Sequence, residues 1–243
     1  MIVQVMSDIH LEFHLDGGKQ FIGLLDATGV DVLVLAGDVG TSKQHETALR
    51  FLCAKYPHVV LVLGNHDYYR ATLLQVHQGL QKLCAELPNL HWLHNSTVEI
   101  LGQRFIGTPL WFADHPLNEV YAKSLNDFHQ IPQFRTWNYQ ENQRATEFLR
   151  DNLRPGDFVV THHLPTHRSN KHYQNDPLSR FFVCDLEPLL YQGEAAVWVH
   201  GHTHESMRYT FGETLVLCNP FGYLEFKVNE DFDPRLLVNP KLT

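Results

Sequence analysis

Five short apolar runs of this sequence end in Asp, Asn or His, and this pattern constrains the fold more than any other feature. The runs are IVQVM (2–6), VDVLVLAG (30–37), HVVLVLGN (58–65), DFVVTHH (157–163) and AAVWVHG (195–201). Short runs rich in β-branched residues and bounded by Gly, Asp or Asn are typical of buried strands. Continuous apolar runs of this kind are typical of parallel sheets, which are covered on both faces.

Helical periodicity separates several of these runs. Apolar side chains recur at helical spacing in residues 41–56, 71–87 and 139–153, which we expect to be helices. The stretches 96–112 and 206–228 instead alternate apolar and polar residues, with Gly at turn positions, and predict hairpins. The expected fold is therefore α/β, with two packed mixed β-sheets flanked by helices.

No linker or internal repeat divides the chain, so we expect one domain over residues 1–243. Residues 113–138 are rich in aromatic side chains and predict an irregular connection. This connection has two open interpretations, a loop that shapes the substrate site and a plain covering loop.

Composition narrows the class of protein. The net charge of −8 disfavours a nucleic-acid-binding module, whose signature is a basic patch. The N-terminus lacks the pattern of a signal peptide, and no stretch reaches the roughly 18 apolar residues of a membrane span. The four cysteines stand apart from one another and predict free thiols in a reducing compartment. We therefore expect a cytoplasmic protein with no membrane partner.

The residues that follow the apolar runs have the chemistry of metal ligands. In open α/β sheets the carboxyl ends of the strands line the ligand crevice, so these side chains are expected at one rim. Each fragment alone has an ordinary explanation, such as a turn, a helix cap or a hydrogen-bonded corner. Five such endings together would place costly polar groups beside a buried sheet without reason unless they bind something. The residues are Asp8, His10, Asp38, Asn65, His66, Asp67, His162, His163, His200, His202 and His204.

The donor types indicate which metals would bind. Imidazole, carboxylate and amide groups without thiolate suit catalytic Mn, Fe or Zn rather than structural zinc. The candidate ligands are too many for one ion. They suit two divalent or trivalent ions about 3.5–4 Å apart that share one carboxylate, as in two-metal hydrolases.

The ordered motifs D-x-H, G-D, G-N-H-D, T-H and G-H-T-H resemble those of the calcineurin-like metallophosphoesterase superfamily, in its bacterial, single-domain form. The resemblance implies a four-layer α/β/β/α sandwich and hydrolysis of phosphate mono- or diesters by a metal-bridging hydroxide. It implies that Asp38 bridges the metals and that His66 acts as general acid or phosphate stabiliser. Asp67 would orient His66 or cap the next helix. The implied ligands are Asp8, His10, Asp38 and His204 for one ion, and Asp38, Asn65, His162 and His202 for the other.

Other residues around these motifs are less clearly placed. His163 is an alternative to His162 as ligand, and His200 is expected to face away from the metals or to contact a ligand. Arg168 and Lys171 are the best candidates for binding substrate phosphate outside the metals, although both could be solvated surface charges. Phe221 stands in NPFGY where many bacterial relatives have Arg, so any role of that Arg is lost or moved here.

Three functions remain open, of which the first has the most support. The first is hydrolysis of a small phosphate ester, with no nucleic-acid partner. The second and third are a nuclease and a non-catalytic metal-binding scaffold of the same fold. A scaffold would be expected to lose ligands or the catalytic His, whereas all seven ligands and His66 are present. The sequence fixes neither the oligomeric state nor the identity of the metals.

Overall fold

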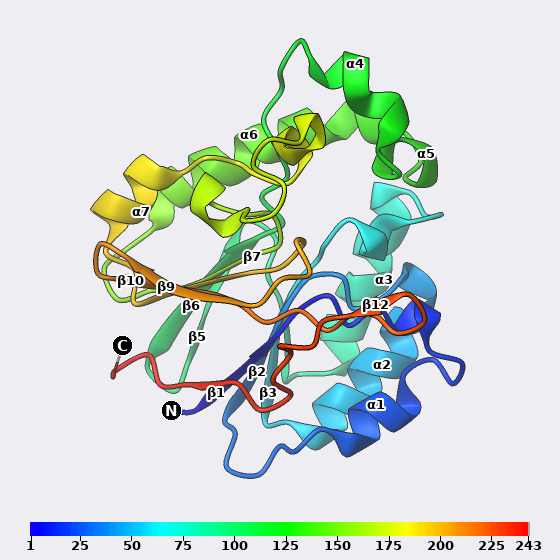
Figure 1. Cartoon of the computed structure of the whole chain (residues 1–243). Helices are drawn as coiled ribbons and strands as arrows, with labels where there is room; N and C mark the ends of the chain where they lie inside the picture. The colour runs from blue at the N-terminus through cyan, green and yellow to red at the C-terminus, as the bar shows by residue number, and fades with distance from the viewer. Residues whose placement is uncertain (243) are drawn as a thin grey trace.

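The computed structural model describes residues 1–242 and contains two large β-sheets (Figure 1). In the first sheet, four parallel strands are joined at one edge by a short antiparallel strand. Its order is β13 (Leu237–Val238), β1 (Val3–Met6), β2 (Val32–Ala36), β3 (His58–Val62) and β4 (Leu90–Trp92). The pairing of β1 with β13 brings the two chain ends together, as Figure 1 shows.

The second sheet is mixed, with parallel strands at its centre and an antiparallel hairpin at each edge. Its order is β5 (Ser96–Ile100), β6 (Gln103–Thr108), β7 (Phe158–Thr161), β8 (Val197–His200), β10 (Thr214–Cys218) and β9 (Met207–Phe211). A small pair, β11 (Gly222–Tyr223) and β12 (Lys227–Val228), follows. The two hairpins expected over 96–112 and 206–228 are therefore present.

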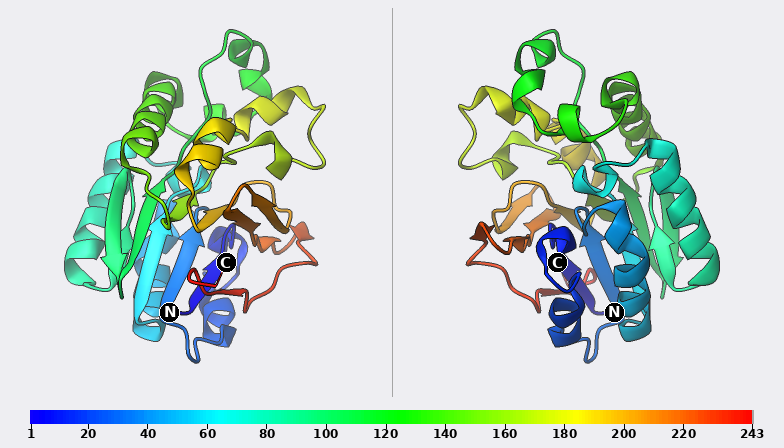
Figure 2. Two further views of the ribbon diagram at one scale, coloured as in Figure 1. Left: turned by 90° about the vertical axis from the view of Figure 1, so that its left-hand side faces the viewer. Right: turned by 90° about the vertical axis from the view of Figure 1, so that its right-hand side faces the viewer.

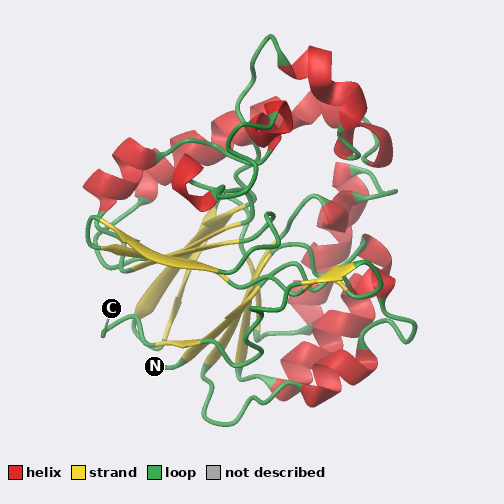
Figure 3. Ribbon diagram, viewed as in Figure 1, coloured by secondary structure: helices red, strands yellow, loops and turns green. Residues whose placement is uncertain are grey.

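Alternate residues of the first sheet belong to different hydrophobic cores. Val32 and Val34 pack with Val199 of the second sheet between the two sheets, whereas Leu33 and Leu35 pack against helices on the outer face. This alternation follows from the twofold period of a strand. A third core, which includes Trp198, lies on the outer face of the second sheet. The layers are thus helix, sheet, sheet and helix, as the side views in Figure 2 and the colours of Figure 3 also show.

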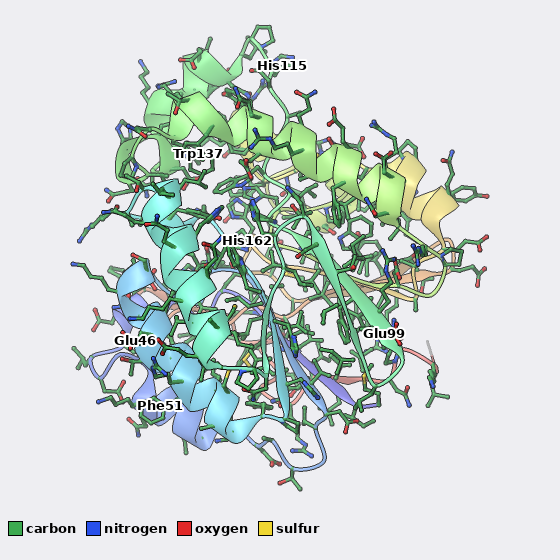
Figure 4. All side chains as sticks on the ribbon, turned by 180° about the vertical axis from the view of Figure 1, so that it is seen from behind. Glu46, Phe51, Glu99, His115, Trp137 and His162 are labelled. Carbon is green, nitrogen blue, oxygen red and sulfur yellow. The ribbon has the colours of Figure 1, made fainter. Side chains whose placement is uncertain are left out.

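The main helices cover the outer faces of the sheets (Figures 1 and 3). The first sheet is covered by α1 (Lys19–Leu24), α2 (Ser42–Lys55) and α3 (Leu73–Glu86). The second sheet is covered by α6 (Phe134–Asn152) and α7 (Glu187–Gly193). In Figure 4, Glu46 and Phe51 lie on the surface of α2, whereas His162 lies in the interior.

The prediction for residues 113–153 was partly wrong. The expected irregular connection contains the short helices α4 (Asn118–Tyr121) and α5 (Asp127–Gln130), and α6 begins at Phe134 rather than at residue 139. The buried stripe of α6 includes Asn138 and Glu141, so its first turns lack the apolar periodicity of an ordinary core helix.

Two further sequence predictions concern the cysteines and the membrane. All four cysteines are free, and three of them are buried. Among the described residues, no helix is both long enough and apolar enough to cross a membrane.

Candidate metal centre

The polar endings of both sheets meet at one edge, where the carboxyl ends of the strands converge. The first sheet contributes Asp8 and His10 after β1, Asp38 after β2 and Asn65 after β3. The second sheet contributes one histidine after β7 and two after β8, namely His162, His202 and His204. The structure therefore brings together all seven residues that the resemblance implies as ligands.

These side chains form compact groups of donor atoms. Within each group the potential ligand atoms lie within 4.8 Å of one another. The groups are Asp8 with His10 and His204, Asp38 with His162 and His202, and His10 with Asp38 and His66. Two of the three groups contain Asp38, so this carboxylate lies between two possible ion positions.

Individual distances describe the same arrangement. His10 Nε2 lies 3.0 Å from His204 Nε2, and Asp38 Oδ2 lies 3.7 Å from His10 Nε2 and 3.5 Å from His162 Nε2. On the other side, Asn65 Oδ1 lies 3.0 Å from His162 Nε2 and 3.1 Å from His202 Nδ1. Ring nitrogens and oxygens thus converge on two adjacent points.

The backbone around these residues is held in an uncommon conformation. Five of the seven have a positive φ: Asp8 (51°), His10 (43°), Asp38 (54°), His202 (77°) and His204 (55°). A positive φ is rare for residues other than Gly and costs energy that the surrounding structure must offset. Such concentration of strain is typical of functional sites.

Glycines before the polar residues allow the two sheets to approach closely. A Cβ at Gly201 would lie 2.6 Å from Asp8 Oδ2 and 2.7 Å from the carbonyl oxygen of Ala36. A Cβ at Gly64 would overlap the Asp38 carboxylate and the ring of His162. These two glycines are therefore points where the two sheets approach closely.

Burial and charge perturb the carboxylates in opposite directions. Burial, together with the neighbouring charges of Asp8 and Asp67, raises the pKa of Asp38 well above its usual range. Burial also acts to raise the pKa of Asp8, but contact with His204 and the nearby imidazoles lowers it overall. Crowded buried carboxylates of this kind are stabilised by cations.

Burial favours the neutral form of three histidines of the site, His10, His162 and His202. Desolvation lowers the pKa of His10 to about 4 and lowers the pKa of His202 well below its usual value. Burial likewise lowers the pKa of His162. Neutral imidazole is the form that binds metal ions.

The donor set fits two metal ions. His202 Nδ1 and His162 Nε2 face each other at 3.2 Å, and His10 Nε2 and His204 Nε2 face each other at 3.0 Å. Two facing lone-pair nitrogens are stabilised only by a shared proton or a cation. The Cβ positions absent at Gly64 and Gly201 leave the space that these groups need.

Asp67 makes neither of the two predicted contacts, one with His66 and one with the N-terminus of helix α3. Its carboxylate accepts hydrogen bonds from the backbone N–H groups of Asp38 (2.9 Å) and Gly64 (2.8 Å) and from His45 Nε2 (2.7 Å). Helix α3 is capped by Thr72 instead, through a capping box. Because Asp67 is fully buried and committed to these partners, it braces the loops and neither orients His66 nor caps the helix.

Three residues that sequence reasoning missed surround His66. Glu12 Oε1 accepts a hydrogen bond from His66 Nδ1 (2.9 Å), Tyr223 OH lies 3.3 Å from His66 Nε2, and Tyr69 stacks on the ring with centroids 4.1 Å apart. Glu12 follows His10 by two residues, and Tyr223 ends the NPFGY motif, so their proximity to motifs was the available signal.

The other two histidines of the motifs lie beside the cluster. His163 is fully buried and stacks on His202, with ring centroids 4.4 Å apart. Its Nδ1 lies 3.3 Å from the carbonyl oxygen of Pro109. His200 Nδ1 lies 3.0 Å from the carbonyl oxygen of Gly201, and His200 belongs to none of the ligand groups.

A cavity of about 320 Å³ opens onto the cluster. Its walls come from segments far apart in the sequence, including α5 and the residues before it, the loop around Tyr173, and the β11–β12 pair. A second cavity of about 490 Å³ adjoins it and shares Tyr173, His204 and Lys227 with it. The two cavities form an open groove along one side of the cluster.

The two predicted phosphate-binding cations lie outside the first cavity. Arg168 stacks over Phe211 at 4.5 Å and pairs with Glu187 at 3.6 Å, so its guanidinium has other partners here and its role in substrate binding stays a prediction. Lys171 lines only the adjoining cavity. The cation that lines both cavities is Lys227, which sequence reasoning missed because it lies beyond the last metal motif.

A buried cluster of histidines and carboxylates at the edge where the sheets of an α/β/β/α sandwich meet has the make-up of a metal-binding site. The family model described as calcineurin-like phosphoesterase matches residues 1–206, so the chain belongs to this family. The protein is therefore a metallophosphoesterase-family hydrolase with buried His/Asp metal-site clusters.

Similar proteins agree with this family. An uncharacterized protein of Acanthamoeba polyphaga mimivirus is 26% identical over 274 aligned residues, which cover 98% of this chain and 96% of that protein. Phosphopantetheinyl hydrolase of Mycobacterium tuberculosis has a similar fold, with a TM-score of 0.76, 15% identity, and coverage of 92% of this chain and 90% of the other. A Thermus thermophilus protein has a TM-score of 0.60 and 15% identity, with coverage of 90% and 88%. These structural likenesses concern the fold alone.

Proposed function

We propose that this protein hydrolyses phosphate esters of low molecular weight with two metal ions bound at the edge where the sheets meet. The observation that carries the proposal is the position of Asp38 between two groups of donor atoms. In this assignment Asp38 would be a ligand of both ions. The first ion would be held also by Asp8, His10 and His204, and the second by Asn65, His162 and His202.

Bound ions in such a pair activate a water molecule and neutralise charge on the phosphoryl group, a role that Mn, Fe or Zn could fill. The protein residues hold the ester beside the pair and limit its exposure to solvent. As the water oxygen forms its bond to phosphorus, the ester P–O bond breaks. His66 Nε2, which faces the cavity, then donates a proton to the departing oxygen.

The shape of the cavity supports a small but extended substrate. Ser124, Leu125 and Asn126 line one part of the cavity, which supports a role of the 113–138 segment in shaping the substrate site. Tyr173 and Phe182 stack at a 22° interplanar angle with centroids 6.0 Å apart, and both line the cavity. These side chains offer an apolar surface to the group that the phosphate esterifies. The adjoining cavity leaves room for a second ester substituent, so both monoesters and diesters fit.

Lys227 supports anion binding in the same groove. It pairs across β11–β12 with Tyr223, which contacts His66, so both side chains lie on the same face of this small sheet. Phe221, which replaces the Arg of related motifs, packs instead against Phe21 and Phe232. We assign to Lys227 a contact with substrate phosphate that could replace any such contact made by the Arg of related motifs.

The test is a panel of p-nitrophenyl phosphate, bis(p-nitrophenyl) phosphate and cyclic nucleotides, measured with Mn²⁺, Zn²⁺ and Fe²⁺. Metal content is measured on the same samples. Activity on at least one ester that requires two bound ions per chain is expected. A protein that binds two ions and hydrolyses none of these esters would contradict the proposal. Cleavage of single- or double-stranded DNA or RNA in preference to the small esters would instead make it a nuclease.

A further inference from the structure

A single carboxylate oxygen contacts two different histidines of the site. Glu12 lies in the short 3₁₀ turn Leu11–Phe13 that follows His10, and its side chain is only 13% exposed. Its Oε1 atom accepts hydrogen bonds from His10 Nδ1 at 3.2 Å and from His66 Nδ1 at 2.9 Å. The two imidazole rings meet edge to face with centroids 4.5 Å apart.

We propose that Glu12 is a positioning residue that keeps the Nδ1 proton on both His10 and His66 and thereby directs both Nε2 atoms into the site. This inference rests on the proposed function, in which His10 binds a metal ion and His66 donates a proton. Glu12 itself contacts neither the metal positions nor the substrate cavity. It would act only through the two histidines.

The contact between Glu12 and His10 is of the kind that orients a metal-binding histidine. A metal-binding histidine commonly donates its other ring N–H to a carboxylate, which fixes the tautomer and the ring orientation. With Nδ1 engaged by Glu12, the lone pair on His10 Nε2 faces His204 Nε2 and Asp38 Oδ2. Without Glu12, the ring could carry its proton on Nε2 and lose its ligand atom.

The contact with His66 has a second consequence. Tyr69 packs on one face of the His66 ring and Glu12 holds Nδ1, so Nε2 is the nitrogen left to face the cavity. A carboxylate opposite Nδ1 stabilises the imidazolium, which is the form that donates a proton from Nε2. Tyr223 OH, 3.3 Å from Nε2, marks where an oxygen can lie relative to this nitrogen.

Asp67, another buried carboxylate near the site, cannot take over this function. It accepts hydrogen bonds from three backbone N–H groups, those of Asp38, Gly40 and Gly64, and from His45, so it is committed to the loops that carry Asp38 and Gly64. Glu12 is thus the residue through which an ion ligand and the proton donor are coupled. The positive φ of His10 (43°) turns the chain so that Glu12 returns toward the ring.

The experiment compares Glu12→Gln, His66→Asn and the double variant in the metal-loaded enzyme. The substrates are a series of aryl phosphate esters from p-nitrophenyl to phenyl, because only the poorer leaving groups need protonation. Glu12→Gln is expected to slow the phenyl ester about 10–100-fold and the p-nitrophenyl ester much less. His66→Asn is expected to give the same pattern. The double variant is expected to match His66→Asn in its dependence on the leaving group.

Two measurements do not depend on activity. Nitrogen-15 NMR of the metal-free protein should show His66 protonated on Nδ1, and Glu12→Gln should convert it to a mixture of tautomers. Calorimetric titration with Zn²⁺ should show that Glu12→Gln lowers the affinity for one of the two ions by about 10–100-fold. Glu12→Asp keeps the charge on a shorter side chain. It should therefore retain part of the Nδ1 protonation of His66 and part of the Zn²⁺ affinity that Glu12→Gln loses.

Glu141→Gln is the matched control, because Glu141 is a buried carboxylate that contacts a histidine, His94 Nε2 at 3.0 Å, away from the cavity. It should leave the leaving-group dependence and the metal affinity unchanged. If His66→Asn steepens that dependence and Glu12→Gln does not, the inference is overturned. If His66→Asn has no such effect, the proton-donor role fails instead. The His66 tautomer and the Zn²⁺ affinity of Glu12→Gln then decide the inference.

Discussion

The two sheets contribute chemically different halves to the same cluster. The edge of the first sheet supplies every oxygen donor, from Asp8, Asp38 and Asn65, and one imidazole. The edge of the second sheet supplies imidazoles alone, from the His162 segment and the G-H-T-H segment. Neither sheet by itself holds a complete set of ligands, so the site exists only where the two sheets pack together.

The halves are also held in place by different forces. On the first sheet, backbone N–H groups fix the carboxylates: His66 N donates to Asp38 Oδ1 (2.8 Å) and His202 N donates to Asp8 Oδ1 (3.0 Å). On the second sheet, the histidines are fixed by burial, and His162 Nδ1 also bonds across the sheets to the carbonyl oxygen of Ala36 (2.9 Å). Each half is therefore held partly by the other, because the N–H that fixes Asp8 comes from the second sheet and the carbonyl that fixes His162 comes from the first.

The largest effect is expected where the halves meet. Asp38→Asn keeps the shape of the side chain but removes the charge that both groups of donors share. We expect activity to fall by more than about a hundredfold, since the loss of outer contacts alone costs 10–100-fold. Metal analysis should show both ions weakened. His204→Asn is the comparison, because it should weaken one ion and leave the other bound. Retention of two tight ions by Asp38→Asn would contradict a shared ligand.

The next effect tests how closely the halves approach. An alanine at Gly201 would place its Cβ against Asp8 Oδ2 and the Ala36 carbonyl, and the rigid backbone cannot yield. We expect Gly201→Ala to lower the free energy of unfolding by about 1–3 kcal/mol and to weaken metal binding. Urea unfolding and Zn²⁺ titration measure the two effects.

The control for this substitution is Gly79→Ala, because Gly79 lies within α3 with open space around it. It should raise the free energy of unfolding by about 0.5–1 kcal/mol. If both glycine variants behaved alike, close approach of the sheets at Gly201 would be refuted.

A third effect separates His200 from its neighbours in the same motif. Burial lowers the pKa of His200 to about 4, and its Nε2 has no partner among the described residues. In the unfolded chain the pKa is about 6.5, so the unfolded state binds the proton first as the pH falls. This group therefore stabilises the fold above pH 6.5, and its contribution is lost between about pH 6.5 and 4.

His200→Leu should remove this loss of stability at low pH, and the variant should still bind two ions. Urea unfolding of the metal-free protein at pH 7.5 and pH 5 should show a smaller drop than in the unmodified protein, by up to about 1.4 kcal/mol per pH unit. His202→Leu, two residues away, should lose an ion. An unchanged pH dependence in His200→Leu would show that this imidazole does not titrate between the two states.

The sequence predicts one part of this site and not another, depending on whether local patterns or tertiary packing decide it. The strands and their polar endings follow from local patterns, namely apolar runs and the rule that parallel strands end at one edge. The partners of Glu12 and Asp67 do not follow, because each carboxylate has several possible neighbours and only tertiary packing selects among them. The early start of α6 was missed because Asn138 and Glu141 occupy its buried stripe.

The smallest expected effect concerns the open side of the groove. Lys227 is exposed, so its attraction for a phosphate is screened by solvent and is worth about 0.2–1 kcal/mol. Lys227→Ala should therefore raise KM by a factor of about 2–5 and leave kcat nearly unchanged, with a larger effect at low ionic strength. Arg168→Ala is the matched control, since that guanidinium is committed to Glu187 and Phe211. A larger effect of Arg168→Ala on KM would mean that substrate enters past the second sheet's loops rather than along the β11–β12 pair.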